Sequence, residues 1–211
     1  MTSCEPANSP LNLVLASASE RRLKLLHQIG IVPDVVDPSG VDERQFSRGE
    51  TPAGLAARLG KRKAEVVFAR HPGCLVLGAD TVVACGRRVL NKPEDPHHAR
   101  YFLGLLSGRR HRVHTGLCLI APGKVVRERL VTTVVRFKPL SVQEIQTYLG
   151  SGEWRGKAGG YAIQGHAGAF VTAINGSYSN VVGLPLYETY ALLMGSGYRF
   201  FADNLGRSTP V

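Results

Sequence analysis

Two serines and two arginines near the start of the chain could bind an anion. Ser17 and Ser19 follow a short apolar run, and Arg21 and Arg22 begin the helical pattern that comes next. The first turn of a helix attracts anions and ordinarily disfavours arginine. We interpret this segment as a phosphate cradle in which hydroxyls and guanidiniums contact phosphate oxygens. The alternative is that Ser19 is only an N-cap and that both arginines are solvated.

Carboxylates supply a second kind of chemistry. Asp80 interrupts the apolar run 75–83, where an unpaired buried charge would be costly. Because ligands bind at the carboxyl ends of strands in open α/β sheets, this acid suits a metal ligand or a general base. An aspartate that ends the strand in a turn is the alternative. Asp42 and Glu43 form an acidic pair in a loop, and with Asp80 they could complete an all-oxygen Mg²⁺ site.

A lysine and two histidine pairs are weaker candidates for a functional site. Lys92 is held extended before a proline, but by itself a solvent-facing lysine in a turn is the simpler interpretation. His111 and His114 are three apart on an expected strand and face opposite sides, while His97 and His98 diverge on an expected helix. Neither histidine pair makes a good chelate. The sequence has no Gly-x-x-x-x-Gly-Lys-Ser/Thr loop and no Gly-x-Ser-x-Gly elbow, which excludes P-loop NTPases and the commonest hydrolase triad.

The elements that would position these groups alternate between strands and helices. Continuous apolar runs predict strands at 11–16, 74–80 with a continuation at 82–83, 113–120 and 131–137. Helical periodicity with capping signals predicts helices at 20–30, 52–70, 96–106, 141–150 and 185–195. A Gly-rich stretch spans 156–168. This alternation predicts an α/β fold.

Length, composition and charge narrow the class of protein. The 211 residues are 44% hydrophobic and 20% charged, so the chain can bury a core and is neither disordered nor fibrous. The net charge of +10 indicates an anionic partner. Most of the excess lies in residues 106–211, with 12 basic and 5 acidic side chains. The densest run, 109–112, is short, and we expect a solvated strand edge or loop rather than a nucleic-acid-binding arm.

The expected location follows from the lack of a recognisable signal peptide or membrane-spanning run in the sequence. Residues 1–10 do not resemble a signal peptide, and no run approaches the roughly 18 apolar residues of a membrane span. The four cysteines contain no Cys-x-x-Cys pair and are expected to be free thiols. We therefore expect a soluble cytoplasmic protein with no nucleic-acid and no membrane partner.

A series of ordered motifs resembles the Maf family of nucleoside triphosphate pyrophosphatases. The stretches are LASASERR at 15–22, DE at 42–43, LGKRKA at 59–64, GADTVV at 78–83, LNKP at 90–93, LSGRRHRVHTG at 106–116, KAGGYAIQG at 157–165 and INGSYSNVVGLPLYET at 174–189. The resemblance covers 11–195 as a single domain of two lobes around a cleft, with 1–10 and 198–211 as flexible tails. It implies an elongated, bent mixed sheet flanked by helices, as in the inosine triphosphatases, and a homodimer.

The resemblance also implies roles for individual residues. The reaction would hydrolyse a nucleoside triphosphate to the monophosphate and diphosphate with a divalent cation, Mg²⁺ or Mn²⁺. Asp80 would activate water and, with Glu43, hold the metal. The residues that would bind the triphosphate are Ser17, Arg21, Arg22, Lys63 and Lys92. This set agrees with the chemistry, because a substrate with about four negative charges needs several cationic donors and a metal ion.

The expected base preference depends on Gln164. The segment 161–165, with Arg21 and Thr81, resembles the branch that acts on dTTP and UTP. The Gln164 amide offers the donor and acceptor that match a uracil or thymine edge. A surface-loop amide is the alternative. Two positions depart from the family pattern: Asn91 stands where an acid is common, and Glu20 replaces a common proline. A pyrophosphatase for 7-methyl-GTP or inosine triphosphate is the alternative enzyme, and a nucleic-acid-binding module the non-enzymatic alternative.

Overall fold

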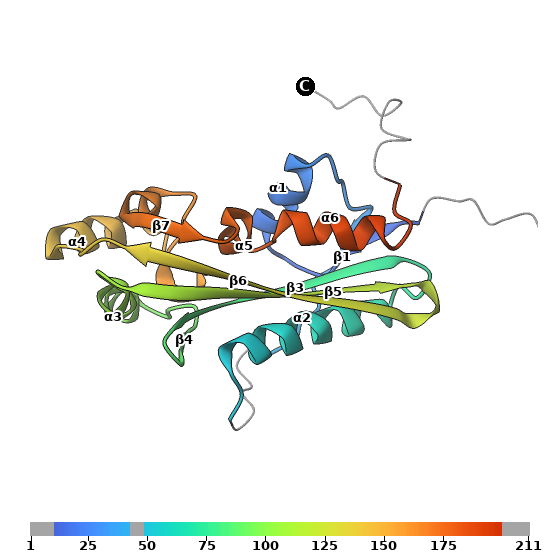
Figure 1. Cartoon of the computed structure of the whole chain (residues 1–211), viewed down its shortest axis with the longest axis horizontal. Coiled ribbons are helices and arrows are strands. Elements are labelled where there is room, and N and C mark those ends of the chain that lie inside the picture. Colours follow the sequence, from blue (N-terminus) through green and yellow to red (C-terminus); the bar gives the residue numbers. More distant parts are fainter. Residues whose placement is uncertain (1–10, 43–48, 200–211) are drawn as a thin grey trace, which may run out of the picture.

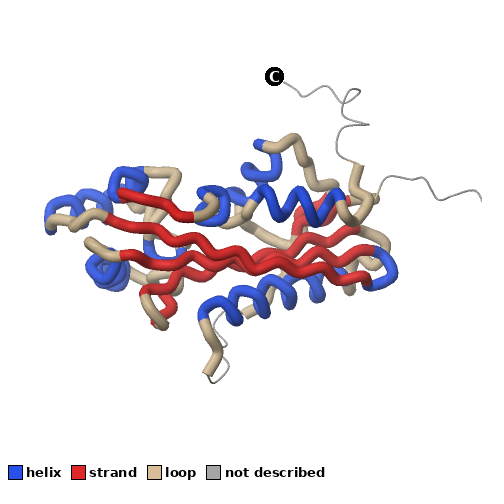
Figure 2. The backbone as a smooth tube through the Cα atoms, viewed as in Figure 1, coloured by secondary structure: helices blue, strands red, loops and turns tan. Residues whose placement is uncertain are grey.

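The structure, a computed structural model, describes residues 11–42 and 49–199. Its strands are β1 Leu13–Leu15, β2 Val35–Val36, β3 Leu75–Cys85, β4 Arg88–Leu90, β5 Arg110–Ala121, β6 Val125–Phe137 and β7 Val171–Asn175. They form one seven-stranded sheet in the order β2-β1-β3-β5-β6-β7, with β4 paired to β3 (Figure 2). β1 pairs in parallel with β2 and β3, and the other pairs are antiparallel. The predicted α/β class with a mixed sheet is confirmed.

Helices cover both faces of the elongated sheet. They are α1 Glu20–Gln28, α2 Pro52–Phe68, α3 Pro96–Leu106, α4 Val142–Ser151, α5 Tyr178–Val182 and α6 Leu186–Met194. In Figure 1, α2 lies along one side of the sheet, α1, α5 and α6 lie on the other, and α3 and α4 gather at one end. This arrangement leaves the turn between β1 and α1 close to the middle of the sheet.

Local capping chemistry accounts for where several helices begin. The Thr51 hydroxyl accepts from Gly54 N–H ahead of α2, and the Asp95 carboxylate accepts from His98 N–H ahead of α3. Ser141 and Glu144 form a reciprocal capping box at the start of α4. Each of these contacts satisfies backbone donors that the first helical turn leaves unpaired. These three predicted helix starts are therefore confirmed.

The β5–β6 hairpin is longer than its apolar runs predict. Its pairing extends from Arg110 opposite Arg136 to Ala121 opposite Val125, across a short 3₁₀ turn at Pro122–Lys124. The outer parts of both strands carry exposed charged side chains, so the apolar pattern ends before the hydrogen-bonded ladder does. The basic run 109–112 accordingly enters β5, with Arg109, Arg110 and Arg112 exposed and His111 buried.

Helix α2 approaches the sheet closely because glycine lines the contact. A Cβ atom on Gly116 of β5 would lie 2.2 Å from the Ala56 carbonyl oxygen, closer than any real contact. Next to this crossing, Ala64 and Val67 of α2 pack against Val76 and Cys118 of the sheet. The close approach fixes where the side chains of α2 reach the sheet.

The sequence predicted flexible tails at both ends of the chain and no membrane-spanning segment. The expected tails fall largely outside the described residues, at 1–10 and 200–211. Tyr198, assigned to the second tail from the sequence, donates its backbone N–H to Leu193 and packs against the core. Among the described helices, none combines the length and apolar character that crossing a membrane requires.

Candidate active site

A gap in strand pairing along one edge of β3 creates the site. β1 pairs with this edge only as far as Leu15 opposite Leu77, and β4 takes over from Val83. Within the described ranges, residues 78–82 therefore have a partner strand on one side only, which is β5. Asp80 and Thr81 lie in this gap, and their side chains point to opposite faces of the sheet. Groups from both helical layers can thus meet at one place.

A cavity of about 620 Å³ opens at this gap. The turn between β1 and α1 contributes residues 16–22, and the loops 38–41, 156–158 and 181–183 complete much of the wall. Most of the site residues predicted from the sequence line it together: Ser17, Arg21, Arg22, Lys63, Asp80, Thr81 and Lys92. Segments more than 150 residues apart in the sequence therefore meet around one space.

A buried ion pair lies at the sheet wall of the cavity. Lys63 Nζ, from α2, is 2.5 Å from Asp80 Oδ1, and each residue is only 6% exposed. Asp80 lies within β3 and pairs with Gly116, so it does not end the strand in a turn. The strand-ending alternative for Asp80 is wrong. Its carboxylate is held by a cation yet lines the cavity, as a general base or metal ligand requires.

Arg22 connects three parts of the site. Its guanidinium donates to Ser17 Oγ at 2.9 Å, to Thr81 Oγ1 at 3.2 Å and to the Gly183 carbonyl at 2.8 Å. The side chain is buried, and Ser19 makes no side-chain cap although it occupies the N-cap position of α1. The alternative of a simple cap with two solvated arginines is therefore wrong for Arg22. Arg22 therefore holds the Ser17 and Thr81 hydroxyls and the Gly183 carbonyl around its guanidinium.

Arg21 and Lys157 bring positive charge to the cavity, and neither forms an ion pair with a carboxylate of the described residues. Burial and, secondarily, the charge of Arg22 lower the pKa of Arg21. Burial and then the charge of Arg21 lower the pKa of Lys157. Sequence reasoning did not assign Lys157 a role, although it begins the KAGG stretch. The cavity-lining cations are Arg21, Arg22, Lys63, Lys92 and Lys157, against the carboxylates of Glu20 and Asp80. Such a lining favours a polyanionic ligand.

The family assignment follows from comparison with known proteins. The family model described as Maf-like protein matches residues 12–196. The chain belongs to the Maf family. The dTTP/UTP pyrophosphatase of Paramagnetospirillum magneticum is 60% identical over 186 residues, which cover 88% of this chain and 97% of that protein. The dTTP/UTP pyrophosphatase of Caulobacter vibrioides is 59% identical over 187 residues, covering 89% and 96%.

Solved structures give a more distant similarity. The nucleoside-triphosphatase, dITP/XTP pyrophosphatase, of Mycobacterium abscessus matches with a TM-score of 0.43 and 14% sequence identity. The match covers 89% of this chain and 95% of that structure. A Ham1 protein from Coxiella burnetii matches 60% of this chain with a TM-score of 0.40 and 15% identity.

Of the residues singled out from the sequence, one does not line the cavity of this Maf protein and another lies outside the described residues. Gln164 is exposed and is not among the residues that line the cavity. Glu43 lies outside the described residues, next to the exposed Asp42. Among the described residues, no cluster of three His, Cys, Asp or Glu side chains could hold a metal ion. In the part of the chain that the structure describes, Glu20 and Asp80 supply the carboxylates that line the cavity, so a metal ion there would need further oxygen ligands, such as those of the substrate.

Other parts of the Maf cavity were not identified from the sequence at all. The loop 38–41 and the segment 181–183 lack a titratable side chain, so residue chemistry gave no signal for them. Tyr161 belongs to the KAGGYAIQG motif but was given no role of its own, yet its buried ring lines the cavity. The hydrogen bond from the Arg22 guanidinium to the Gly183 carbonyl shows why 181–183 lies here. Such contacts become visible only once the chain is folded.

Proposed function

We propose that this protein is a nucleoside triphosphate pyrophosphatase that hydrolyses dTTP and UTP to the monophosphate and diphosphate. The observation that carries the proposal is the cavity in which Asp80, held by Lys63, shares one lining with four further cationic side chains. Family membership and the names of relatives near 60% identity support the same activity. A house-cleaning role, removing unwanted pyrimidine nucleotides, belongs to this proposal.

The proposed reaction is an attack by water on the α-phosphorus. One oxygen–phosphorus bond forms, the bond to the bridging oxygen of the β-phosphate breaks, and diphosphate leaves with the electron pair. Asp80 accepts the proton that the attacking water loses. The cations Arg21, Arg22, Lys63 and Lys92 bind the phosphate chain and stabilise the negative charge that develops on the leaving group. Lys63, 2.5 Å from Asp80 Oδ1, also keeps that carboxylate in place.

A divalent cation, Mg²⁺ or Mn²⁺, fits this proposal. Mg²⁺ is often held by only one or two protein carboxylates, with phosphate and water oxygens as its other ligands. Asp80 would supply such an oxygen at the cavity, and Glu43 is the proposed second holder. When bound, the ion would neutralise charge on the phosphate chain and lower the pKa of a coordinated water molecule.

The pyrimidine preference rests on the resemblance more than on geometry. Thr81 lines the cavity but already contacts Arg22 and Thr115 through its hydroxyl. Gln164 would have to approach the base from its exposed position. A preference for 7-methyl-GTP or inosine triphosphate is the competing specificity. Replacement of Gln164 by Ala should reduce the ratio of UTP to GTP hydrolysis, and an unchanged ratio would remove Gln164 from base selection.

The activity is tested with purified full-length protein, Mg²⁺ or Mn²⁺, and a panel of UTP, dTTP, CTP, GTP, inosine triphosphate and 7-methyl-GTP. Diphosphate, rather than orthophosphate, should appear first with UTP and dTTP. Asp80→Asn should lower the rate by at least about 100-fold, as expected for loss of a general base. Asp95→Asn is the matched control, because Asn also serves as an N-cap for α3. Absence of diphosphate release with every nucleotide, or full activity of Asp80→Asn, contradicts the proposal.

Assembly and location stay predictions. The homodimer and the cytoplasmic location come from the family resemblance and the sequence. Sedimentation of the purified chain tests the dimer, since a monomer at micromolar concentration would contradict it.

A further inference from the structure

Lys157 is a cavity residue that the proposed reaction does not yet use. It follows α4 and directly precedes the short 3₁₀ turn Ala158–Gly160. Its side chain is half-buried and lines the same cavity as Asp80 and Arg21. Lysine is seldom buried without a partner, because removing its charge from water is costly. The position therefore calls for a ligand or a carboxylate.

No described carboxylate takes that role. The Lys157 ammonium group donates to the Arg155 carbonyl at 3.2 Å, and no ion pair joins it to an acidic side chain within the described ranges. Glu153, which raises the pKa of Lys157 as a lesser influence, is already bound to His166 through both carboxylate oxygens. Among the charges that act on the pKa of Lys157, that of Arg21 acts most strongly and is of the same sign, while Glu153 and Glu20 act less strongly in the opposite direction.

The backbone holds Lys157 beside Lys92. The Gly159 N–H donates to the Asn91 carbonyl at 3.2 Å, and the Gly160 N–H donates to the Lys157 carbonyl at 3.0 Å. Gly159 has φ of +72°, and a Cβ there would lie 2.9 Å from Val83 Cγ1, so the turn packs directly on β3. Two lysines from segments that are hydrogen-bonded to each other thus line one cavity. Their placement is fixed by main-chain contacts, not by flexible side chains.

We propose that Lys157 is a substrate-binding residue whose ammonium group contacts phosphate oxygens of the nucleotide and of the diphosphate product. The inference rests on the proposed function, because a polyphosphate is the ligand. Bound phosphate would lie near Lys157 and Arg21 together and replace their mutual repulsion by two attractions.

Substitution separates this role from a structural one. Lys157→Gln should raise the KM for UTP and the Ki for diphosphate at least tenfold, with a smaller change in kcat, while Lys157→Arg restores both to within threefold. Lys24→Gln, which removes an exposed lysine of α1 outside the cavity lining, should change either constant less than twofold. The melting temperature of the ligand-free Lys157→Gln protein should be equal to or above that of the unaltered protein. A lower melting temperature with unchanged KM and Ki would overturn the proposal.

A proton-linkage measurement gives an independent readout. Because burial and Arg21 lower the pKa of Lys157 in the empty cavity, a bound anion should raise that pKa and draw a proton from solution. Calorimetric titration with α,β-methylene-UTP at pH 9, in buffers of different ionisation enthalpy, should show proton uptake that Lys157→Gln reduces. Equal uptake by both proteins contradicts the inference.

Failure of the inference about Lys157 can be distinguished from failure of the proposed function. If the unaltered protein hydrolyses no nucleotide, titration with diphosphate alone still compares it with Lys157→Gln. At least tenfold weaker diphosphate binding by the variant would support Lys157 as an anion-binding residue even then. If the unaltered protein is active and Lys157→Gln has the same KM, Ki and proton uptake, only the inference about Lys157 fails.

Discussion

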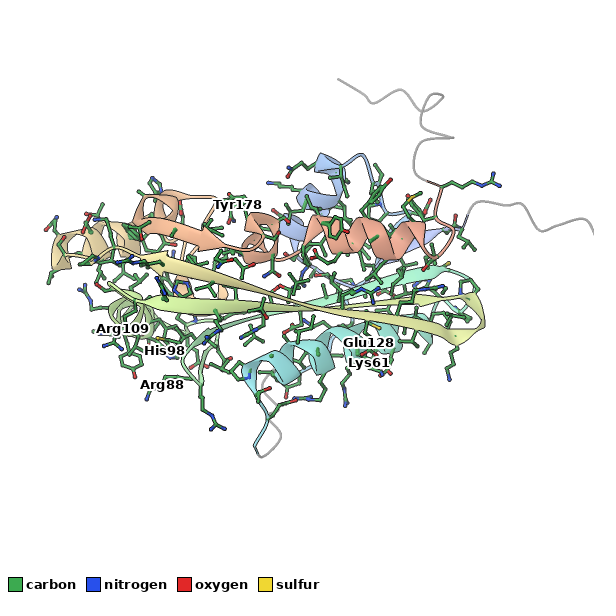
Figure 3. All side chains as sticks on the ribbon, in the orientation of Figure 1. Lys61, Arg88, His98, Arg109, Glu128 and Tyr178 are labelled. Carbon is green, nitrogen blue, oxygen red and sulfur yellow. The ribbon has the colours of Figure 1, made fainter. Side chains whose placement is uncertain are left out.

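At the scale of single residues, the site depends on two buried charges of opposite sign. Lys63 and Asp80 come from different layers, α2 and β3, and each would be costly to bury alone. Their contact differs in kind from the surface pair formed by Lys61 and Glu128, whose side chains are each 44% exposed. Figure 3 shows Lys61 and Glu128 side by side at α2. The two lysines stand two residues apart on one helix, which makes them a natural comparison.

We predict that Lys63→Met lowers the free energy of unfolding by about 3–5 kcal/mol, because it leaves the Asp80 carboxylate buried without its cation. Lys61→Met should lower it by about 0–1 kcal/mol, since water screens the exposed pair. Urea unfolding followed by circular dichroism measures both. Diphosphate release should fall sharply in Lys63→Met and stay near normal in Lys61→Met. Similar losses of stability in the two variants would show that the buried pair has no special role.

At the scale of elements, α2 must lie close to the sheet for Lys63 to meet Asp80. Gly116 makes this possible, because the Ala56 carbonyl occupies the space of a missing side chain. A similar contact sets the position of the cavity wall, where Gly159 packs on Val83. The distance between helix and sheet is thus determined at a few positions by the absence of a Cβ atom.

We predict that Gly116→Ala displaces α2 and lowers the free energy of unfolding by about 1–3 kcal/mol or more, as overpacking does. Activity should fall further than stability alone explains, because Lys63 moves with the helix. Gly104→Ala is the control: it lies exposed within α3 with nothing within 4 Å of the added Cβ. That change should stabilise the protein by about 0.5–1 kcal/mol. Full activity in Gly116→Ala would show that the close approach does not position the site.

The elements also divide into those that local sequence predicts and those that it does not. Helices α2, α3 and α4 start at side chains that cap their own backbone, so the information lies within four residues. β2, β4, β7 and α5 were not predicted, because two to five residues carry no periodicity. β2 and β7 form by pairing with strands that are distant in the sequence, and β4 forms a tight hairpin with β3. Local sequence therefore predicted most of the longer helices and strands, but not the short elements.

The residues of the site also divide into those that the sequence predicts and those that it does not. Ser17, Arg22, Asp80 and Lys63 share one cavity, as the ordered motifs implied. The gap in pairing along β3 could not be predicted, because it depends on where β1 stops relative to β4. Lys157 was missed for a related reason: only the hydrogen bond between Gly159 and Asn91 brings its turn to the cavity.

At the scale of the whole molecule, much of the positive charge lies away from the cavity. Arg110 of β5 stands directly opposite Arg136 of β6, a pairing of like charges that disfavours the sheet. Arg112 lies two residues further along the same face, and all three side chains are exposed. Nucleotides approach a protein of net charge +10, so this excess is suited to raise their rate of encounter. The same excess makes the folded state sensitive to further protonation.

A separate source of acid sensitivity is the buried His111, which lies in a cluster of aromatic rings next to the cavity. Its ring is 1% exposed, is joined to the Tyr161 hydroxyl by a 2.8 Å hydrogen bond, and meets Phe137 edge-on at 5.0 Å. The other ring nitrogen, Nδ1, has no hydrogen-bond partner within the part of the chain that the structure describes. Burial lowers the pKa of His111 from 6.5 to about 4. Tyr161 also lines the cavity, so this cluster couples the core to the site.

Acid should therefore unfold the protein through His111. Above pH 6.5 the histidine is neutral in both states and its effect is constant. As the pH falls from 6.5 towards 4, His111 binds a proton in the unfolded chain but not in the folded chain. The free energy of unfolding therefore falls by about 3 kcal/mol. Urea unfolding at pH 7, 6, 5 and 4.5 should give a steep decline in the unaltered protein and a flatter one in His111→Phe. His27→Gln, at an exposed position, should keep the steep decline. Parallel curves for the unaltered protein and His111→Phe would assign the acid sensitivity to other groups.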